Sequence, residues 1–229
     1  MELLRTLEQK VAPGRAMVVT VDVQNDFCHS EGFLGRLGAP MGQIQAMVPG
    51  LARFLDAARE RGVPITHVIS HHDEEYASPV VTEQKLRHGL PMEQDGRPLR
   101  DAPYCLKNTW GAELYGIDAR PGEEIVIKHR YSGFKGTNLD LLLRSAGIQT
   151  VILTGVATNA CVESTGRDAY MHDYYLVFVS DGTATTSPAA HQATLANIDQ
   201  FFGQVARIDE IVGAWPAVPA RGRAVAVGR

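Results

Sequence analysis

Cysteine is scarce in this sequence, with three residues among 229, namely Cys28, Cys105 and Cys161. This number and this spacing do not provide the disulfide framework that holds small secreted domains together. An odd number of cysteines also leaves at least one thiol without a partner in the same chain. We therefore expect free thiols, one of which could be reactive.

Long apolar runs and a strong charge of one sign are also missing. No stretch reaches the ~18 apolar residues of a membrane-spanning helix. Residues 1–15 mix charged side chains with leucines and lack the apolar centre of a signal peptide. The net charge is −4 and no basic stripe is present, which argues against a nucleic-acid partner. These absences favour a cytoplasmic protein that binds neither nucleic acid nor a membrane.

Three common signatures of cofactor or metal binding are absent as well. The chain contains no GxxxxGK[ST] loop, no GxGxxG after a predicted strand, and no HExxH helix. We therefore expect no nucleotide and no organic cofactor.

The pattern that remains alternates short β-branched runs with amphipathic stretches. It predicts a single domain over residues 1–229, with a three-layer α/β/α fold and a mainly parallel sheet of about six strands. The expected strands are 16–23, 63–70, 124–129, 150–154, 175–180 and 204–208. The expected helices are 43–61, 137–146, 160–173 and 188–202, with a short one at 111–115. The core should span about 15–210, with a long surface loop at 71–103 and a loosely ordered tail at 213–229.

Polar residues that could perform chemistry follow the predicted strands. Ligands of open parallel sheets bind beyond the carboxyl ends of the strands. Asp22 ends the first strand, Lys128 ends the third, and Cys161 follows the fourth at the start of a helix. An acid, an amine and a thiol at one edge could perform nucleophilic acyl transfer. The alternatives are a turn-forming aspartate, a solvated strand-end lysine and a buried, inert cysteine.

Cys161 is the sharpest of these signals. The dipole of the helix that it begins, together with the ammonium of Lys128, would favour its thiolate form. Asp22 could accept the thiol proton and pass it to a leaving amine.

Three parts of the sequence together resemble the isochorismatase-like cysteine hydrolases: residues 21–27 (VDVQNDF), Lys128, and residues 155–161 (GVATNAC). The resemblance is closest to the ureidoacrylate, triuret and biuret amidohydrolases. It implies a Rossmann-like topology and a catalytic triad of Asp22, Lys128 and Cys161. It also implies a cis peptide bond before Ala157, and an oxyanion hole formed by the backbone N–H groups of Ala157 and Cys161. A homo-oligomer, either a dimer or a tetramer, is implied as well.

The expected activity is hydrolysis of a C–N bond in a small ureido or carbamoyl compound through a thioester, with release of ammonia or a carbamoyl-derived product. The alternatives are a nicotinamidase or maleamate-type amidase, and an inactive scaffold of the same fold. Nicotinamidases hold a metal with an Asp-x-His pair, whereas residues 70–74 read SHHDE here. His71, His72, Asp73 and His88 could still bind a divalent ion, but we expect no metal.

Four residues are candidates for substrate binding. By resemblance, Phe27 forms a wall of the pocket, although it could also be plain core. Asn25 orients groups at the site or caps a turn. Arg130 and Tyr131 could hold a carboxylate or a ureido oxygen, or could be a surface arginine and a packed tyrosine. Trp110 could cap the pocket or lie at a subunit contact.

Overall fold

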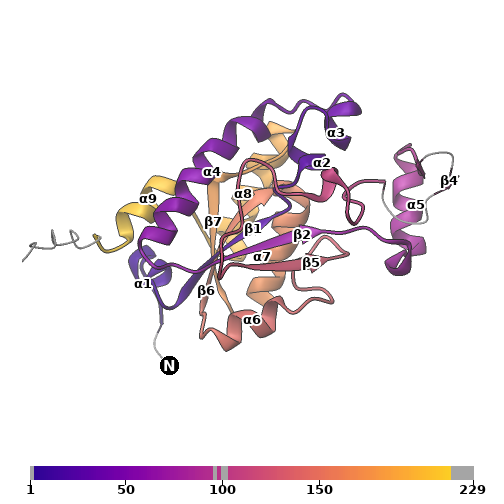
Figure 1. Cartoon of the computed structure of the whole chain (residues 1–229). Helices are drawn as coiled ribbons and strands as arrows, with labels where there is room; N and C mark the ends of the chain where they lie inside the picture. Colours follow the sequence, from indigo (N-terminus) through magenta and orange to yellow (C-terminus); the bar gives the residue numbers. More distant parts are fainter. Residues whose placement is uncertain (1–2, 95–96, 99–102, 218–229) are drawn as a thin grey trace, which may run out of the picture.

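The structure is a computed structural model that describes residues 3–94, 97–98 and 103–217. Its centre is a six-stranded sheet in which all neighbouring strands run parallel (Figure 1). Across the sheet the order is β5 (Glu124–Lys128), β2 (Ile65–Ser70), β1 (Ala16–Val21), β6 (Thr150–Val156), β7 (Tyr175–Ala184) and β8 (Gln204–Ala206). The predicted α/β class and the parallel sheet are confirmed.

The central strands are buried along their whole length. Every residue of β1, β2 and β6 is buried, as expected for parallel strands that helices cover on both faces. Strand β5 lies at the edge of the sheet and alternates, with Val126 buried and Ile125 and Ile127 exposed. The apolar, β-branched sequences of the central strands thus follow from burial on two sides.

Helices cover both faces of the sheet. On one face lie α1 (Leu7–Val11), α4 (Gly42–Glu60) and α9 (Ile208–Ala214), and on the other lie α6 (Leu139–Ser145), α7 (Glu163–Met171) and α8 (Pro188–Phe201). The larger apolar residues of α4 recur at helical spacing and are buried on the side that faces the sheet, namely Ile44, Met47, Val48, Leu51, Phe54 and Leu55. The helix ends just before Gly62, whose φ of 70° suits a C-terminal cap.

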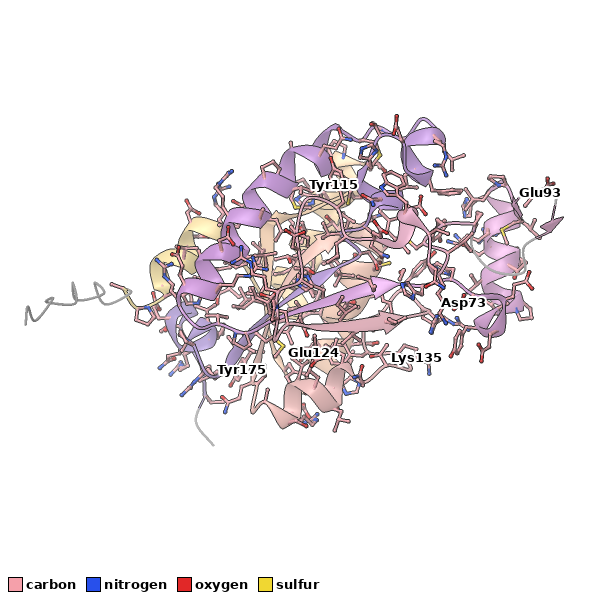
Figure 2. The ribbon with its side chains drawn as sticks, viewed as in Figure 1. Asp73, Glu93, Tyr115, Glu124, Lys135 and Tyr175 are labelled. Atoms are coloured by element: carbon pink, nitrogen blue, oxygen red, sulfur yellow. The ribbon has the colours of Figure 1, made fainter. Side chains whose placement is uncertain are left out.

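The strand order indicates where along the sheet a ligand site is expected. Numbered by sequence within this sheet, the order is 3-2-1-4-5-6, that of a doubly wound fold, and it reverses between β1 and β6. Val21 pairs with Gly155 at the carboxyl ends of these two strands. In Figure 2 the starts of β5 and β7, at Glu124 and Tyr175, lie away from α5, whereas Asp73, just after β2, lies beside it. The carboxyl edge of the sheet therefore faces α5.

The prediction of a surface loop over 71–103 is wrong for much of that segment. It contains a 3-10 turn (Glu74–Tyr76), helix α5 (Pro79–Arg87) and the two-residue antiparallel strands β3 (Glu93–Gln94) and β4 (Arg97–Pro98). Helix α5 begins with a proline, which is favourable there because the N–H of the first helical residue would have no acceptor within the helix. Its sequence is mostly polar, so no apolar periodicity marks it. Residues 95–96 and 99–102 lie outside the described residues.

Several short elements were not predicted. Helices α2 (Asn25–Cys28) and α3 (Phe33–Arg36) are single turns, and α9 extends into the predicted tail as far as Ala214. The predicted helix at 111–115 is a 3-10 turn, Trp110–Ala112. The part of the tail beyond residue 217 lies outside the described residues. No helix in the described part of the chain is long and apolar enough to cross a membrane.

Candidate active site

The carboxyl ends of three strands bring an acid, an amine and a thiol together. The Lys128 Nζ atom lies 2.8 Å from Asp22 Oδ2 and 3.4 Å from Cys161 Sγ. Asp22 and Lys128 are 1% exposed, and Cys161 is 9% exposed. The structure thus brings together the three residues that the sequence predicts as a triad.

The backbone around Asp22 is tightly constrained. Asp22 itself has a φ of 53°, which is uncommon for a residue other than glycine, and its N–H donates to the carbonyl of Val68 in the neighbouring strand. Gly155 has a φ of 115°, and a Cβ atom there would overlap the carbonyl of Val21. Only glycine therefore lets β6 approach β1 this closely beside the acid.

Ser70 is a member of the site to which the sequence assigned no role. Its hydroxyl donates to Asp22 Oδ1 at 2.9 Å and accepts from Lys128 Nζ at 2.8 Å. The buried side chain of Gln24 fixes the backbone of Ser70. It accepts a hydrogen bond from the Ser70 N–H at 2.8 Å and donates one to the Ser70 carbonyl at 2.9 Å. Lys128 also donates to the carbonyl of Arg130 at 3.1 Å. No motif marks Ser70, and its position at the end of β2 is the only signal that could have found it.

The protonation of the thiol differs from the sequence prediction. Burial, followed by the negative charge of Asp22, raises the pKa of Cys161 to about 12, and the lowering effect of Lys128 does not compensate. Burial alone would lower the pKa of Lys128, but its interactions with Asp22, and after that with Cys161, raise it overall. The direction of the shift is therefore opposite to the lowering of the thiol pKa that the sequence predicts, because burial and Asp22 outweigh Lys128.

The segment that carries Cys161 is a π-helical turn, Thr158–Val162, that leads directly into α7. A cis peptide bond joins Val156 to Ala157, where the family resemblance places it. The carbonyl of Cys161 accepts from Thr165 Oγ1 at 2.7 Å, and that hydroxyl accepts from Gly133 N–H at 2.9 Å. Ala157 and Cys161 both border the same cavity. The role of their N–H groups as an oxyanion hole stays a prediction.

The triad lies in the wall of a cavity of about 460 Å³, a volume that suits a small molecule. Three of the predicted substrate-binding residues line it, namely Phe27, Arg130 and Tyr131. Two further lining residues, Lys85 of α5 and Tyr104, carried no sequence signal. Tyr104 packs edge-on against Phe27, with ring centroids 5.2 Å apart.

Asn25, the fourth predicted substrate-binding residue, does not line this cavity. Its side chain is buried and donates to the carbonyl of Trp110 at 2.8 Å, which holds the loop. Trp110 is also absent from the cavity wall. The neighbouring Asp26 clamps the same region, accepting from the N–H groups of Phe33 and Cys105 at 2.9 Å and 2.7 Å.

The histidines after β2 form no cluster with other candidate metal ligands. Among residues 3–94, 97–98 and 103–217, no three His, Cys, Asp or Glu side chains are grouped so as to hold a metal ion. His72 lines the cavity and packs edge-on against Tyr104, while burial lowers the pKa of His71. The expectation of a metal-free site stays a prediction.

Comparison with known proteins identifies the family. The family model described as "Isochorismatase domain" matches residues 16–210. The chain belongs to the isochorismatase family. Among the similar proteins of this family, the ureidoacrylate amidohydrolase RutB of Agrobacterium fabrum is 32% identical over an alignment of 206 residues, and the match covers 88% of this chain and 90% of that protein.

Solved structures agree with this membership in the isochorismatase family. An isochorismatase-like hydrolase from Alkaliphilus metalliredigens has 29% identity and a TM-score of 0.69, covering 88% of this chain and 99% of that one. The N-carbamoylsarcosine amidase of Thermoplasma acidophilum has 28% identity and a TM-score of 0.64, with 85% and 97% covered. The predicted family, its fold and the hydrolase class are confirmed. The predicted homo-oligomer concerns contacts between chains and stays a prediction.

Proposed function

We propose that this isochorismatase-family protein is a cysteine-dependent amidohydrolase that cleaves a C–N bond of a small ureido or carbamoyl compound. The observation that carries the proposal is the position of Lys128, whose ammonium contacts both Asp22 and Cys161 at the wall of a cavity that suits a small molecule. The names of the relatives, an amidohydrolase of ureidoacrylate and an amidase of N-carbamoylsarcosine, support the same chemistry.

In the first half of the reaction, a thioester forms. Because the pKa of Cys161 is raised, a base must remove its proton as the sulfur attacks the substrate carbonyl, and Asp22 is the acceptor beside the thiol. The ammonium of Lys128 stabilises the developing thiolate. The N–H groups of Ala157 and Cys161 stabilise the oxyanion, an interaction whose loss typically slows a reaction by ~100-fold or more. The C–N bond then breaks, and Asp22 gives its proton to the leaving nitrogen.

In the second half, water hydrolyses the thioester. Asp22, again a carboxylate, accepts a proton from the water as its oxygen attacks the thioester carbonyl. The C–S bond breaks, the proton returns to the sulfur, and the acid product leaves. The enzyme ends with Cys161 as a thiol and Asp22 as a carboxylate, which is the state in which the reaction began. No redox step and no co-reactant other than water is needed.

An ammonia-release assay tests the proposal. The panel consists of ureidoacrylate, biuret, triuret, N-carbamoylsarcosine, maleamate and nicotinamide. We expect turnover of at least one ureido or carbamoyl compound, a loss of at least 1,000-fold in Cys161→Ala, and an acyl-enzyme adduct on Cys161 in rapid-quench mass spectrometry. Cys28→Ala, which removes a buried thiol outside the cavity, serves as the matched control and should retain turnover. Wild-type kcat/KM in Cys161→Ala would refute the mechanism, and turnover of nicotinamide alone would refute the substrate class.

A further inference from the structure

Lys85 is a buried lysine that the mechanism above does not use. It lies on α5, is 5% exposed, and lines the same cavity as Cys161. Helix α5 stands beyond the carboxyl ends of β2 and β5 (Figure 1). The cavity therefore has the triad in one part of its wall and a second ammonium on a separate element.

The surroundings of Lys85 are aromatic. Its Nζ atom donates to the hydroxyl of Tyr131 at 3.3 Å, and it lies 5.0 Å and 5.4 Å from the ring centroids of Tyr104 and Tyr131. None of the ion pairs among the described residues involves Lys85. Aromatic faces stabilise a cation only partly, and a buried charge without a counterion is costly. Among the described residues no carboxylate pairs with this ammonium, and the cavity beside it has room for an anionic ligand.

The charge of the cavity wall also favours an anionic ligand. Asp22 is its only acidic residue among those described, and it is already paired with Lys128. Arg130 also lines the cavity, and its guanidinium donates to the carbonyls of Tyr76 and His129 at 3.2 Å and 2.6 Å. Beyond the Asp22–Lys128 pair, the described part of the wall therefore carries Lys85 and Arg130 and no carboxylate. Such a wall attracts anionic substrates and raises their local concentration.

We propose that Lys85 binds the carboxylate of the substrate, so that the enzyme acts on small ureido or amide compounds with a carboxylate at the end remote from the scissile carbonyl. The hydroxyl of Tyr131 lies beside the same ammonium and can donate to the bound carboxylate. Binding at Lys85 then directs the other end of the substrate toward Cys161. This assignment rests on the proposed amidohydrolase function and narrows its substrate class.

A pair of substrates that differ only in charge tests the assignment. N-carbamoyl-β-alanine carries the carboxylate and its methyl ester does not. Wild-type kcat/KM should be at least 10-fold higher for the acid, because charge-assisted hydrogen bonds are the strong ones. Lys85→Met should raise KM for the acid by about 10- to 100-fold and change KM for the ester by less than 2-fold. Lys85→Arg should recover part of the loss, and Lys135→Met, which removes an exposed lysine outside the cavity, should match the wild type.

Other outcomes overturn the assignment in distinguishable ways. Equal losses on acid and ester, or no loss on either, would make Lys85 a structural lysine. If the kcat/KM of the wild type is equal for the ester and the acid, the substrate assignment fails while the amidohydrolase function stands. If no compound of either charge is hydrolysed, the proposed function fails first.

A measurement on the wild-type enzyme covers the case in which Lys85→Met does not fold. N-acetyl-β-alanine and its methyl ester are compared as competitive inhibitors of the turnover of any substrate found by the panel. We expect the acid to inhibit at least 10-fold more strongly, and the difference to shrink as salt is added. Equal inhibition by the two compounds would overturn the assignment without any variant.

Discussion

Replacing Ser70 with alanine removes one hydroxyl that contacts both charged groups beside Cys161. The variant leaves Asp22 Oδ1 without its 2.9 Å donor and Lys128 Nζ without one of its acceptors at 2.8 Å. Each hydrogen bond to a charged group contributes about 1.5–3 kcal/mol. The ammonium keeps its contacts with Asp22 Oδ2 and the carbonyl of Arg130, so part of the loss is offset. We expect Ser70→Ala to lower the free energy of unfolding by about 2–4 kcal/mol.

The same change should reduce catalysis, because Asp22 and Lys128 would no longer be held in one position relative to Cys161. A misplacement that costs about 1.4–2.8 kcal/mol of transition-state stabilisation lowers kcat/KM by about 10- to 100-fold. Ammonia release by Ser70→Ala measures the rate, and urea denaturation measures the stability. The control is Ser145→Ala, at an exposed position at the end of α6, which should change stability by no more than about 0.5 kcal/mol. Wild-type kcat/KM in a folded Ser70→Ala protein would refute the reasoning.

Three further predictions follow from the structure. Burial raises the pKa of Glu123, but hydrogen bonds from Arg59 and its other neighbours lower it to about 2 overall; Glu123→Gln should therefore destabilise the protein by up to about 3 kcal/mol at pH 7. In urea denaturation this difference should shrink as the pH falls from about 4.5 toward 2, and a pH-independent difference would contradict it. Gly155→Ala should abolish folding or activity, because the added Cβ would overlap the main chain of β1. The control is Gly42→Ala in the first turn of α4, where the added Cβ meets open space. In thermal denaturation this control should be neutral or stabilising by up to about 1 kcal/mol. Because the pKa of Cys161 is raised to about 12, its alkylation by iodoacetamide should accelerate about tenfold per pH unit between about pH 7 and 9, and a plateau below about pH 8 would argue against a protonated thiol.

The sequence predicted the sheet well because the signal for a buried parallel strand is local. Runs such as that of β1 are apolar on both faces, and the helix α4 shows its buried side by spacing alone. The triad could be predicted for a related reason. Parallel strands all end at one edge, so residues that follow different strands in the sequence become neighbours in space.

Helix α5 and the role of Ser70 could not be predicted in this way. The sequence of α5 is mostly polar, so nothing in its periodicity separates it from a loop. Ser70 is one hydroxyl at a strand end, and its importance comes from two partners 48 and 58 positions away in the chain. The position of Asn25 outside the cavity could not be predicted either. It lies next to the acid in sequence, but its side chain is buried against the carbonyl of Trp110.

The sequence by itself determined the parallel α/β fold, the family, and the three residues that meet at the carboxyl edge of the sheet. Only the tertiary structure decided the direction in which the pKa of Cys161 shifts, because that pKa depends on how deeply the thiol is buried and how close the carboxylate of Asp22 comes. It also decided that Lys85 belongs to the cavity, because α5 reaches the site through its packing and not through its position in the sequence. Solvation and distance act between segments that lie far apart in the chain, and the order of the residues alone does not contain them.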